Sequence, residues 1–270
     1  MDAKTNLMLR SIFILLQIKV LLIKLNIIFI ISFLHPVNNS FESYNKNSPR
    51  QKTEPVNVNL LHKKGDLWFQ NNHSNPFTGV VFENSKITHN KILECEYRDG
   101  LLHGYYSEWY QSGSKKITGQ YFKGKPNKCW LEWYPNGQLS DSINYLHGNR
   151  NGIWSEWYET GEKLYEGNFI NDLDHGKHLK WFKSGDKAFE FFYKNGKKTG
   201  VCVEWYPNGQ KMYENSFKEG VWDGIWMGWY KTGSKKYEIM YEDGEQIYQL
   251  CWDSLKNSCD CSWYFENGCD

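Results

Sequence analysis

The chain contains 270 residues, of which 17% are aromatic, and its formal net charge at pH 7 is only +1. Residues 1–35 carry a balance of +3, because four lysine and arginine side chains there outnumber Asp2, and this leaves −2 for the rest of the chain. A near-neutral region without a basic stripe argues against a nucleic-acid partner.

Residues 11–34 are strongly apolar, although Gln17, Lys19, Lys24 and Asn26 interrupt them. They fit a signal peptide with a basic start, a membrane-anchoring helix about 36 Å long, or a soluble amphipathic helix. We expect residues 1–34 to be a signal peptide or an N-terminal membrane anchor, which implies an exported or membrane-anchored protein; a cytoplasmic location is the alternative. Residues 35–55 are polar and are expected to form a disordered linker.

A 24-residue period runs through the middle of the chain. Six tryptophans carry it, each followed by a second aromatic residue and, four positions after the tryptophan, by a glycine. They are Trp109, Trp133, Trp157, Trp181, Trp205 and Trp229, with Gly113, Gly137, Gly161, Gly185, Gly209 and Gly233. A strict period of this kind indicates a repeat protein, and its unbroken register predicts one array rather than two domains.

Turn signals occur twice in each period. Residues 134–137 and 206–209 read Tyr-Pro-Asn-Gly, which predicts a hairpin loop with a positive φ at the glycine. The other turn carries Asp-Gly or Asn-Gly in several repeats, and Asp172 takes the place of its glycine once. Runs of about seven residues between the turns are rich in aromatic and β-branched side chains, which favour strands over helices.

The sequence therefore predicts an all-β fold, an elongated single-layer antiparallel meander of about seven 24-residue β-hairpin repeats over residues 56–256. Alternation along a strand would place Trp154 and Glu156 on one face and Ser155 and Trp157 on the other, so both faces would carry aromatic rings. A single layer needs such rings to cover its backbone, and we interpret the six tryptophans as structural core.

Four of the seven cysteines crowd into the end of the chain: Cys251, Cys259, Cys261 and Cys269. In an exported protein they could form two disulfides in a cysteine-rich C-terminal cap over residues 257–270. Free thiols are one alternative. A zinc site is another, although only one residue separates Cys259 from Cys261.

No catalytic, cofactor or metal motif is recognisable, so we expect no enzyme and no cofactor. Glutamates at positions 108, 132, 156 and 204 precede the tryptophans and predict a ladder along the array rather than a carboxylate pair at one site. Phased lysines and glutamates are interpreted as cross-strand pairs. They are Lys163, Lys187, Lys211 and Lys235, with Glu166, Glu190, Glu214 and Glu238.

The unit at residues 200–220, GVCVEWYPNGQKMYENSFKEG, resembles the MORN-variant repeat of the YwqK family of antitoxin-like proteins. Residues 65–70 and 76–79 are similar to the opening of those proteins, and residues 251–253 to their closing strand. The resemblance implies a β-hairpin array associated with protein binding, in some cases beside toxins. Cell-wall choline-binding repeats are also aromatic hairpins and remain an alternative, although the period here is longer.

These observations favour a non-enzymatic repeat module for protein–protein interaction, either a scaffold at the cell envelope or a YwqK-like antitoxin or immunity protein. The expected partner is a protein of unknown identity, with membrane association through the N-terminal segment. The alternative is recognition of membrane lipid or cell-wall glycan through aromatic repeats. An exposed, unshielded tryptophan row would favour the alternative, and a face of mixed charge would favour protein binding.

Overall fold

The structure is a computed structural model that describes residues 54–261, all within the compact unit Thr53–Asp270. The expected signal or anchor segment, almost all of the expected linker, and Cys269 lie outside the described residues. Strands make up 64% of the described part, which contains no α-helix. Among residues 54–261, accordingly, no helix is long and apolar enough to cross a membrane.

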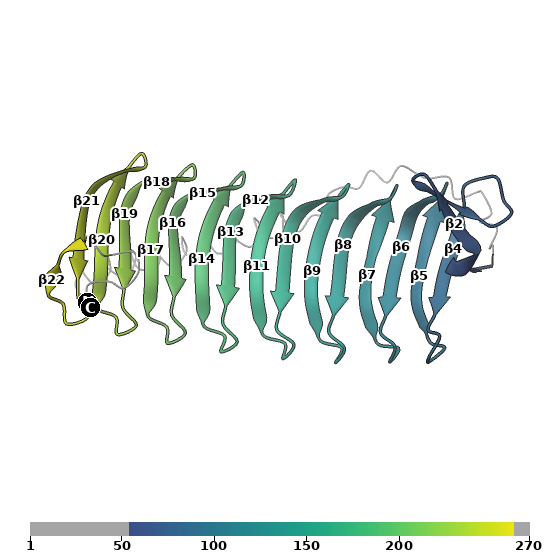
Figure 1. Ribbon diagram of the computed structural model, residues 1–270, viewed down its shortest axis with the longest axis horizontal. Helices are drawn as coiled ribbons and strands as arrows, with labels where there is room; N and C mark the ends of the chain where they lie inside the picture. The colour runs from purple at the N-terminus through teal and green to yellow at the C-terminus, as the bar shows by residue number, and fades with distance from the viewer. Residues whose placement is uncertain (1–53, 262–270) are drawn as a thin grey trace, which may run out of the picture. The chain divides into compact units, whose positions relative to one another are not determined.

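The predicted all-β meander is confirmed. Hairpins succeed one another along a single sheet that does not close on itself, and Figure 1 shows the strands side by side along the long axis of the array. Its strands are β4 (Gly79–Asn84), β5 (Lys91–Arg98), β6 (Leu101–Trp109), β7 (Lys115–Phe122), β8 (Lys125–Trp133), β9 (Leu139–Leu146), β10 (Asn149–Trp157), β11 (Lys163–Ile170), β12 (Leu173–Asp174), β13 (Gly176–Trp181), β14 (Lys187–Lys194), β15 (Lys197–Lys198), β16 (Gly200–Trp205), β17 (Lys211–Lys218), β18 (Val221–Trp222), β19 (Gly224–Trp229), β20 (Lys235–Glu242), β21 (Glu245–Trp252) and β22 (Ser258–Cys259).

The N-terminal end departs from the meander. β1 (Val56–Asn57) pairs with β4 in parallel, and a short 3₁₀ turn, η1 (Val58–Leu60), follows it. β2 (Leu61–Lys64) and β3 (Leu67–Gln70) then form a separate two-stranded antiparallel sheet. These elements precede the repeating register, so the 24-residue period carried no information about their pairing.

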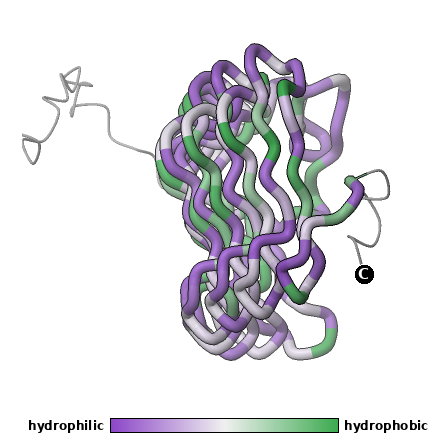
Figure 2. The backbone as a smooth tube through the Cα atoms, turned by 90° about the vertical axis from the view of Figure 1, so that its left-hand side faces the viewer, coloured by the Kyte–Doolittle hydropathy of each residue, from purple (hydrophilic) through white to green (hydrophobic). Residues whose placement is uncertain are grey.

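The predicted Tyr-Pro-Asn-Gly turns form as expected. Gly137 has φ +88°, and its backbone N–H donates to the carbonyl of Tyr134 at 2.9 Å. The amide of Asn136 also donates to the carbonyl of Glu159 in the next hairpin tip, at 3.0 Å. Figure 2, which looks along the stack, shows the successive hairpins following one another with similar traces. The tips therefore hold neighbouring repeats in register as well as reversing the chain.

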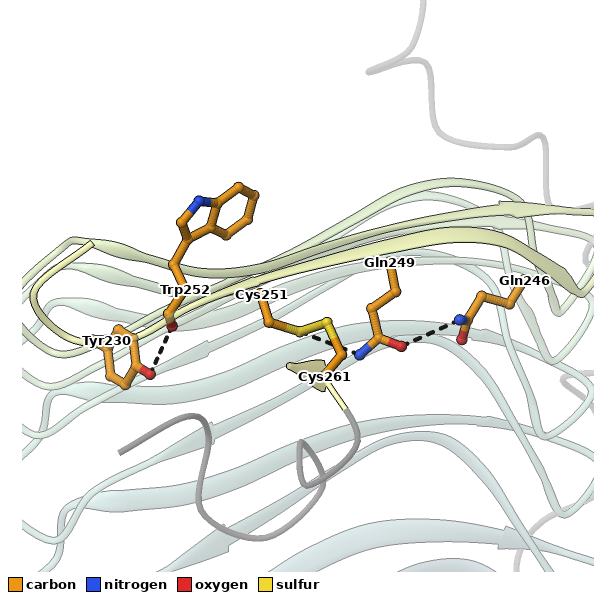
Figure 3. Close-up of a disulfide and its surroundings, with 6 residues drawn as sticks. All are labelled: Tyr230, Gln246, Gln249, Cys251, Trp252 and Cys261. Atoms are coloured by element: carbon orange, nitrogen blue, oxygen red, sulfur yellow. Dashed lines mark hydrogen bonds between the residues drawn. A yellow bond between two sulfur atoms is a disulfide. The ribbon is translucent and has the colours of Figure 1, made fainter. Parts of the chain in front are cut away.

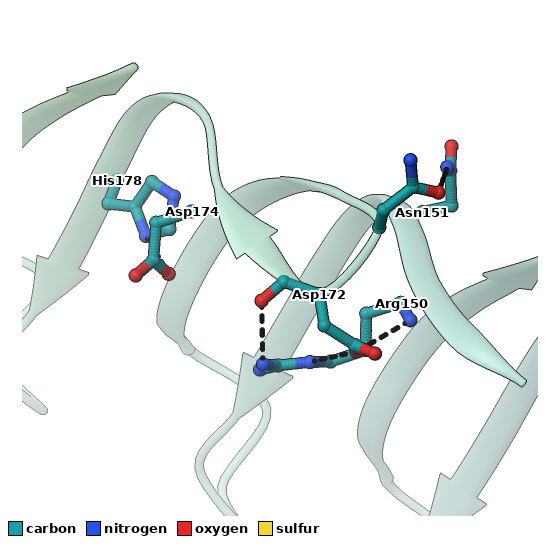
Figure 4. Close-up of polar contacts among 6 residues, drawn as sticks. Arg150, Asn151, Asp172, Asp174 and His178 are labelled. Atoms are coloured by element: carbon teal, nitrogen blue, oxygen red, sulfur yellow. Dashed lines mark hydrogen bonds and ion pairs between the residues drawn. The ribbon is translucent and has the colours of Figure 1, made fainter. Parts of the chain in front are cut away.

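Asp172 replaces the usual glycine in its turn and has φ +66°. Its carboxylate accepts hydrogen bonds from the backbone N–H and the Nε of Arg150, at 2.8 and 3.2 Å, and its carbonyl accepts one from Nη2 of the same arginine (Figure 4). The hydrogen bond from the Arg150 backbone is the main cause that holds the pKa of Asp172 below its usual value. Side-chain contacts to the preceding repeat thus stabilise a backbone conformation that glycine adopts more readily elsewhere.

Buried clusters lie at the two ends of the array. Leu61, Phe77, Val81 and Cys95 form one where β1 to β3 pack on the first hairpin. Tyr237, Ile239, Tyr241 and Cys251 form the other beside Cys259 and Cys261. The central repeats hold isolated buried residues such as Phe169 and His178, while most of their side chains are half-buried. The array is therefore capped at both ends and open between them.

Candidate binding face

One face of the sheet carries interlocking aromatic side chains along almost its whole length, and we call it the aromatic face. Directly opposed residues on neighbouring strands share a face, so the strand register defines its members. They include Tyr106, Tyr121, Trp130, Tyr145, Trp154, Tyr165, Phe169, Tyr193, Phe217, Trp226, Tyr237 and Tyr241. Ring centroids of neighbours lie between 4.9 Å, for Tyr121 and Trp130, and 6.5 Å, for Trp130 and Tyr145.

Small residues lie beneath several of these rings. A Cβ atom added to Gly119 would come within 2.2 Å of the Trp130 ring, and one added to Gly228 within 2.1 Å of Tyr237. The ring therefore lies directly on the backbone of the neighbouring strand, as a single-layer sheet requires. The aromatic rings cover peptide groups that no second layer would protect.

A continuous row of opposed residues crosses the strands on the aromatic face. It runs through Glu83, Leu93, Glu108, Ile117, Glu132, Asp141, Glu156, Tyr165, Lys180, Phe189 and Glu204. We call its first five carboxylates, Glu83, Glu108, Glu132, Asp141 and Glu156, the acidic row. Asp141 is opposed to Glu132 on one side and to Glu156 on the other, so three carboxylates occupy three consecutive strands.

This arrangement corrects the expectation of a simple ladder. The glutamates at positions 108, 132 and 156 do recur once per repeat, but Asp141 lies between two of them and concentrates the charge at one place. Asp141 was missed because the equivalent positions hold Ile117, Tyr165, Phe189 and other apolar or aromatic residues. The signal in the sequence was an aspartate at a repeat position that otherwise holds apolar or aromatic residues.

The carboxylates of the acidic row differ in the direction of their pKa shifts. Burial, followed by the neighbouring Asp141 charge, raises the pKa of both Glu132 and Glu156. Burial also opposes ionisation of Glu108, but hydrogen bonds from Lys116 at 2.8 Å and Tyr106 at 2.5 Å hold its pKa below the usual value. Within the described residues, Glu132 and Glu156 make no hydrogen bond or ion pair.

The start of the acidic row is hollowed. A cleft of about 470 Å³ lies against the first strands and is lined by Glu83, Leu93, Tyr106, Glu108 and Lys116, among others. Further along, the indole N–H of Trp154 donates to the Asp141 carboxylate at 3.3 Å. No group of three potential ligand side chains converges as a metal site anywhere in residues 54–261. The row is an extended charged strip rather than a chelating pocket.

The six phased tryptophans lie on the opposite face, which we call the tryptophan face. None of the six is buried and none is exposed, so the rings are half-buried, and their role as structural core stays a prediction. Lysine ammonium groups of the preceding hairpin lie over most of the rings, as Lys115 does over Trp133 at 5.7 Å and Lys211 over Trp229 at 5.7 Å. Leu139 interrupts this series, and Trp157 is approached by Lys163 of its own hairpin, at 5.9 Å.

The phased lysines pair with the phased glutamates within one strand, not across strands as expected, although Glu190 also pairs across strands with Lys177 at 2.8 Å. Lys187 and Glu190 lie 2.6 Å apart on β14, Lys235 and Glu238 lie 2.6 Å apart on β20, and Lys163 pairs with Glu166 on β11. The register shifts between Lys163 and Tyr165, and an equivalent shift recurs in the other repeats. Such a β-bulge turns the lysine toward the face of the glutamate three residues on, which simple alternation does not predict.

The cysteines divide between the cap and the strands. A disulfide joins Cys251 on β21 to Cys261, with 5.6 Å between their Cα atoms (Figure 3). Cys259 is also disulfide-bonded. Cys95 and Cys202 are buried free thiols, and burial raises the pKa of both; Cys129 is exposed. The structure thus brings Cys251 and Cys261 together in the cap and leaves the three strand cysteines apart.

Three segments of the chain match the family described as MORN repeat variant, at residues 126–147, 150–171 and 198–219. The segments share one phase of the 24-residue period, and the intervening β13 and β14 form the same hairpin. No curated protein matches the chain. MORN repeats are in general modules that interact with proteins or membrane lipids. These three matches, which cover less than half of the chain, support a MORN-repeat protein whose repeats resemble the variant type.

Proposed function

We propose that the array is a non-enzymatic protein-binding module and that its partner binds the aromatic face between the two caps. The observation that carries this proposal is the acidic row, in which Glu132, Asp141 and Glu156 are opposed on consecutive strands. No cationic side chain of residues 54–261 forms an ion pair with any of the three. A half-buried carboxylate without a cation is electrostatically unsatisfied, and a partner that supplies positive charge gains affinity and orientation there.

The tryptophan face also supports protein binding, because lysine side chains shield its rings. Where the preceding hairpin has a lysine at the equivalent position, its ammonium group lies over the tryptophan ring, as Lys187 does over Trp205 at 5.8 Å. The tryptophan row is therefore not an unshielded apolar surface. The acidic row itself would repel the anionic headgroups of a bilayer. Both features fit a protein partner better than a lipid surface.

A second candidate function rests on a different part of the tryptophan face. Phe122, Leu146 and Ile170 occupy equivalent positions at the ends of β7, β9 and β11, and they are 40%, 48% and 41% exposed. Three apolar side chains in a line could insert into a lipid surface or contact a glycan. This observation keeps membrane-lipid or cell-wall glycan binding as the alternative.

The location and the biological setting are also proposals. The basic, apolar residues 1–34 support an exported or membrane-anchored protein, with a cytoplasmic location as the alternative. A scaffold role at the envelope and a YwqK-like antitoxin role would use the same surface, with a toxin as the partner in the second case.

A photo-crosslinking experiment on the full chain tests which face binds. Lys177 and Lys180 both lie exposed on β13, but Lys177 points to the tryptophan face and Lys180 to the aromatic face. A crosslinking amino acid at position 180 should give a discrete protein adduct in the native cell, whereas one at position 177 should not. The adduct should disappear when Asp141→Lys is added.

The same chain is mixed with anionic vesicles and separated by flotation. Flotation that is lost on Phe122→Ser and Leu146→Ser, together with no adduct at position 180, would overturn the protein-binding proposal in favour of the lipid alternative. Identical adducts from positions 177 and 180 would also count against it, because the aromatic face would then have no special role.

A further inference from the structure

We infer that the aromatic face binds a basic segment in the polyproline II conformation, with lysine or arginine at every third residue, lying across the strands along the acidic row. This inference rests on the proposed function and specifies the partner's chemistry. It follows from three properties of the row: the repeat distance of its charges, the fact that within residues 54–261 only Glu108 among them forms an ion pair, and the side chains that separate them.

The repeat distance comes from the sheet. Glu83, Glu108, Glu132 and Glu156 recur on every second strand of the row. Neighbouring strands are about 4.8 Å apart, so successive glutamates are about 9.6 Å apart. A polyproline II helix has three residues per turn and rises about 3.1 Å per residue, so every third side chain points the same way at intervals of about 9.3 Å. Over three intervals the two spacings drift apart by only about 1 Å.

Other regular conformations fit this spacing less well. In an extended strand the side chains on one face recur about every 6.8 Å, which falls out of step with the glutamates after one interval. An α-helix has 3.6 residues per turn, so side chains seven apart rise about 10.5 Å and also rotate away from one line. Polyproline II alone places its charges in a straight line at the required interval.

The charges of the row are available to such a ligand. Lys116 pairs with Glu108 at 2.8 Å, and no other member of the acidic row has an ion pair within the described residues. Asp141 lies halfway between Glu132 and Glu156 and adds a third carboxylate at that end. Lys180 then occupies the next glutamate position and places a positive charge in the row. The favourable stretch therefore ends between Glu156 and Lys180.

The residues between the glutamates fit the rest of the ligand. Leu93 and Ile117 separate the first three glutamates and are half-buried, and the ring of Tyr165 follows Glu156. Polyproline II ligands characteristically pack proline rings on apolar and aromatic surfaces, and their preformed conformation limits the entropy lost on binding. The N-terminal cap borders the start of this stretch, because Leu93 packs against its buried cluster, whereas the C-terminal cluster involves the last hairpin.

Fluorescence anisotropy on the full chain tests the inference with a labelled peptide of repeated Lys-Pro-Pro units. A control peptide has the same composition, but its lysines are gathered in one block. We expect the phased peptide to bind about tenfold more tightly than the block peptide, and we expect its affinity to fall as salt rises. Equal affinities for the two peptides would overturn the inference, because charge alone would then explain the binding.

Substitutions along the row locate the peptide. Asp141→Asn and Glu156→Gln should each weaken the phased peptide about three- to tenfold, and Lys180→Glu should strengthen it by extending the acidic stretch. Glu204→Gln is the matched control, since Glu204 lies in the same row beyond Lys180 and should leave the affinity unchanged. Thermal melts of each variant separate loss of binding from loss of folding. An equal effect of Glu156→Gln and Glu204→Gln would contradict the placement.

The two proposals fail in different ways. If position 180 gives its specific protein adduct but neither peptide binds, the polyproline inference is wrong while the protein-binding function stands. If neither the adduct nor peptide binding appears, the protein-binding function itself fails.

Discussion

At the hairpin tips, tyrosine hydroxyls donate hydrogen bonds to backbone carbonyls of the following repeat. The acceptor is in each case the carbonyl of the next repeat's terminal tryptophan, at 2.7 to 3.0 Å. The donors are Tyr110, Tyr134, Tyr158, Tyr206 and Tyr230. Phe182 occupies the same position in its repeat and has no hydroxyl, so the equivalent bond to Trp205 cannot form.

This exception gives a paired prediction. Phe182→Tyr should raise the free energy of unfolding by about 0.5 to 1.5 kcal/mol, because it supplies the missing donor. Tyr134→Phe should lower it by a similar amount, because it removes the 2.9 Å bond to the Trp157 carbonyl. The midpoints of denaturant unfolding measure both changes, provided that the dependence of the unfolding free energy on denaturant concentration stays the same. A loss of stability in Phe182→Tyr would show that this carbonyl cannot accept a tyrosine hydroxyl.

At the scale of strands, the half-buried tryptophans contact lysine side chains, which come from the preceding hairpin in most repeats and from the same hairpin at Trp157. Trp157→Ala in the middle of the array should lower the free energy of unfolding by about 2 to 3 kcal/mol, less than a fully buried tryptophan would, because part of the ring is already hydrated. Trp157→Phe should retain most of the stability. Chemical denaturation compares the three proteins, and an unchanged midpoint in Trp157→Ala would show that the row contributes to binding rather than to folding.

The acidic row gives a prediction about pH. Burial raises the pKa of Glu156 above its ordinary value of 4.5, so between these two values the folded protein holds more protons than the unfolded chain. Its contribution to stability therefore falls as the pH rises through that window. Glu156→Gln should match the wild type near about pH 4 and be more stable than it near about pH 7.

Denaturation midpoints at the two pH values check this sign. Glu162 is a control whose pKa shift has the opposite sign, because the hydrogen bond from the hydroxyl of Thr160 holds its pKa below the usual value. Glu162→Gln should accordingly be less stable than the wild type at neutral pH. A difference between Glu156→Gln and wild type that does not change with pH would contradict the assignment.

Local chemistry determines how much of these elements the sequence could predict. The turn at Gly137 was predictable because a Pro-Asn-Gly loop has few backbone alternatives, and the period located the strands between such turns. The pairing of Lys163 with Glu166 was not predictable from alternation, because a bulge changes which face a side chain occupies. The concentration of charge at Asp141 depends on which strands lie next to each other, so it required the register of three strands at once.

At the scale of the whole array, each repeat contacts its neighbours only, so damage at one end should remain local. Replacing Cys251 and Cys261 together by alanine removes the disulfide that closes the C-terminal cap, and should cost about 2 to 3 kcal/mol for a loop of this size. Hydrogen exchange should accelerate in β20 and β21 while β8 and β9 keep their protection.

Cys129→Ala is the control for this prediction, because Cys129 is an exposed free thiol on β8 and its loss should leave exchange in β20 and β21 unchanged. Uniform acceleration throughout the array in the double variant would show that the repeats unfold as one cooperative unit instead.

The hairpin-by-hairpin pairing also determines how the array would respond to mechanical load. Among the described residues, a strand of the central repeats pairs with the strand before it and the strand after it, so tension applied to the two ends would peel hairpins away in sequence rather than shear the whole sheet. Each 24-residue repeat that detaches would release about 80 Å of extended chain. Under such tension the protein would behave as an extensible spacer that lengthens in uniform steps, with the repeats still folded keeping their surface intact.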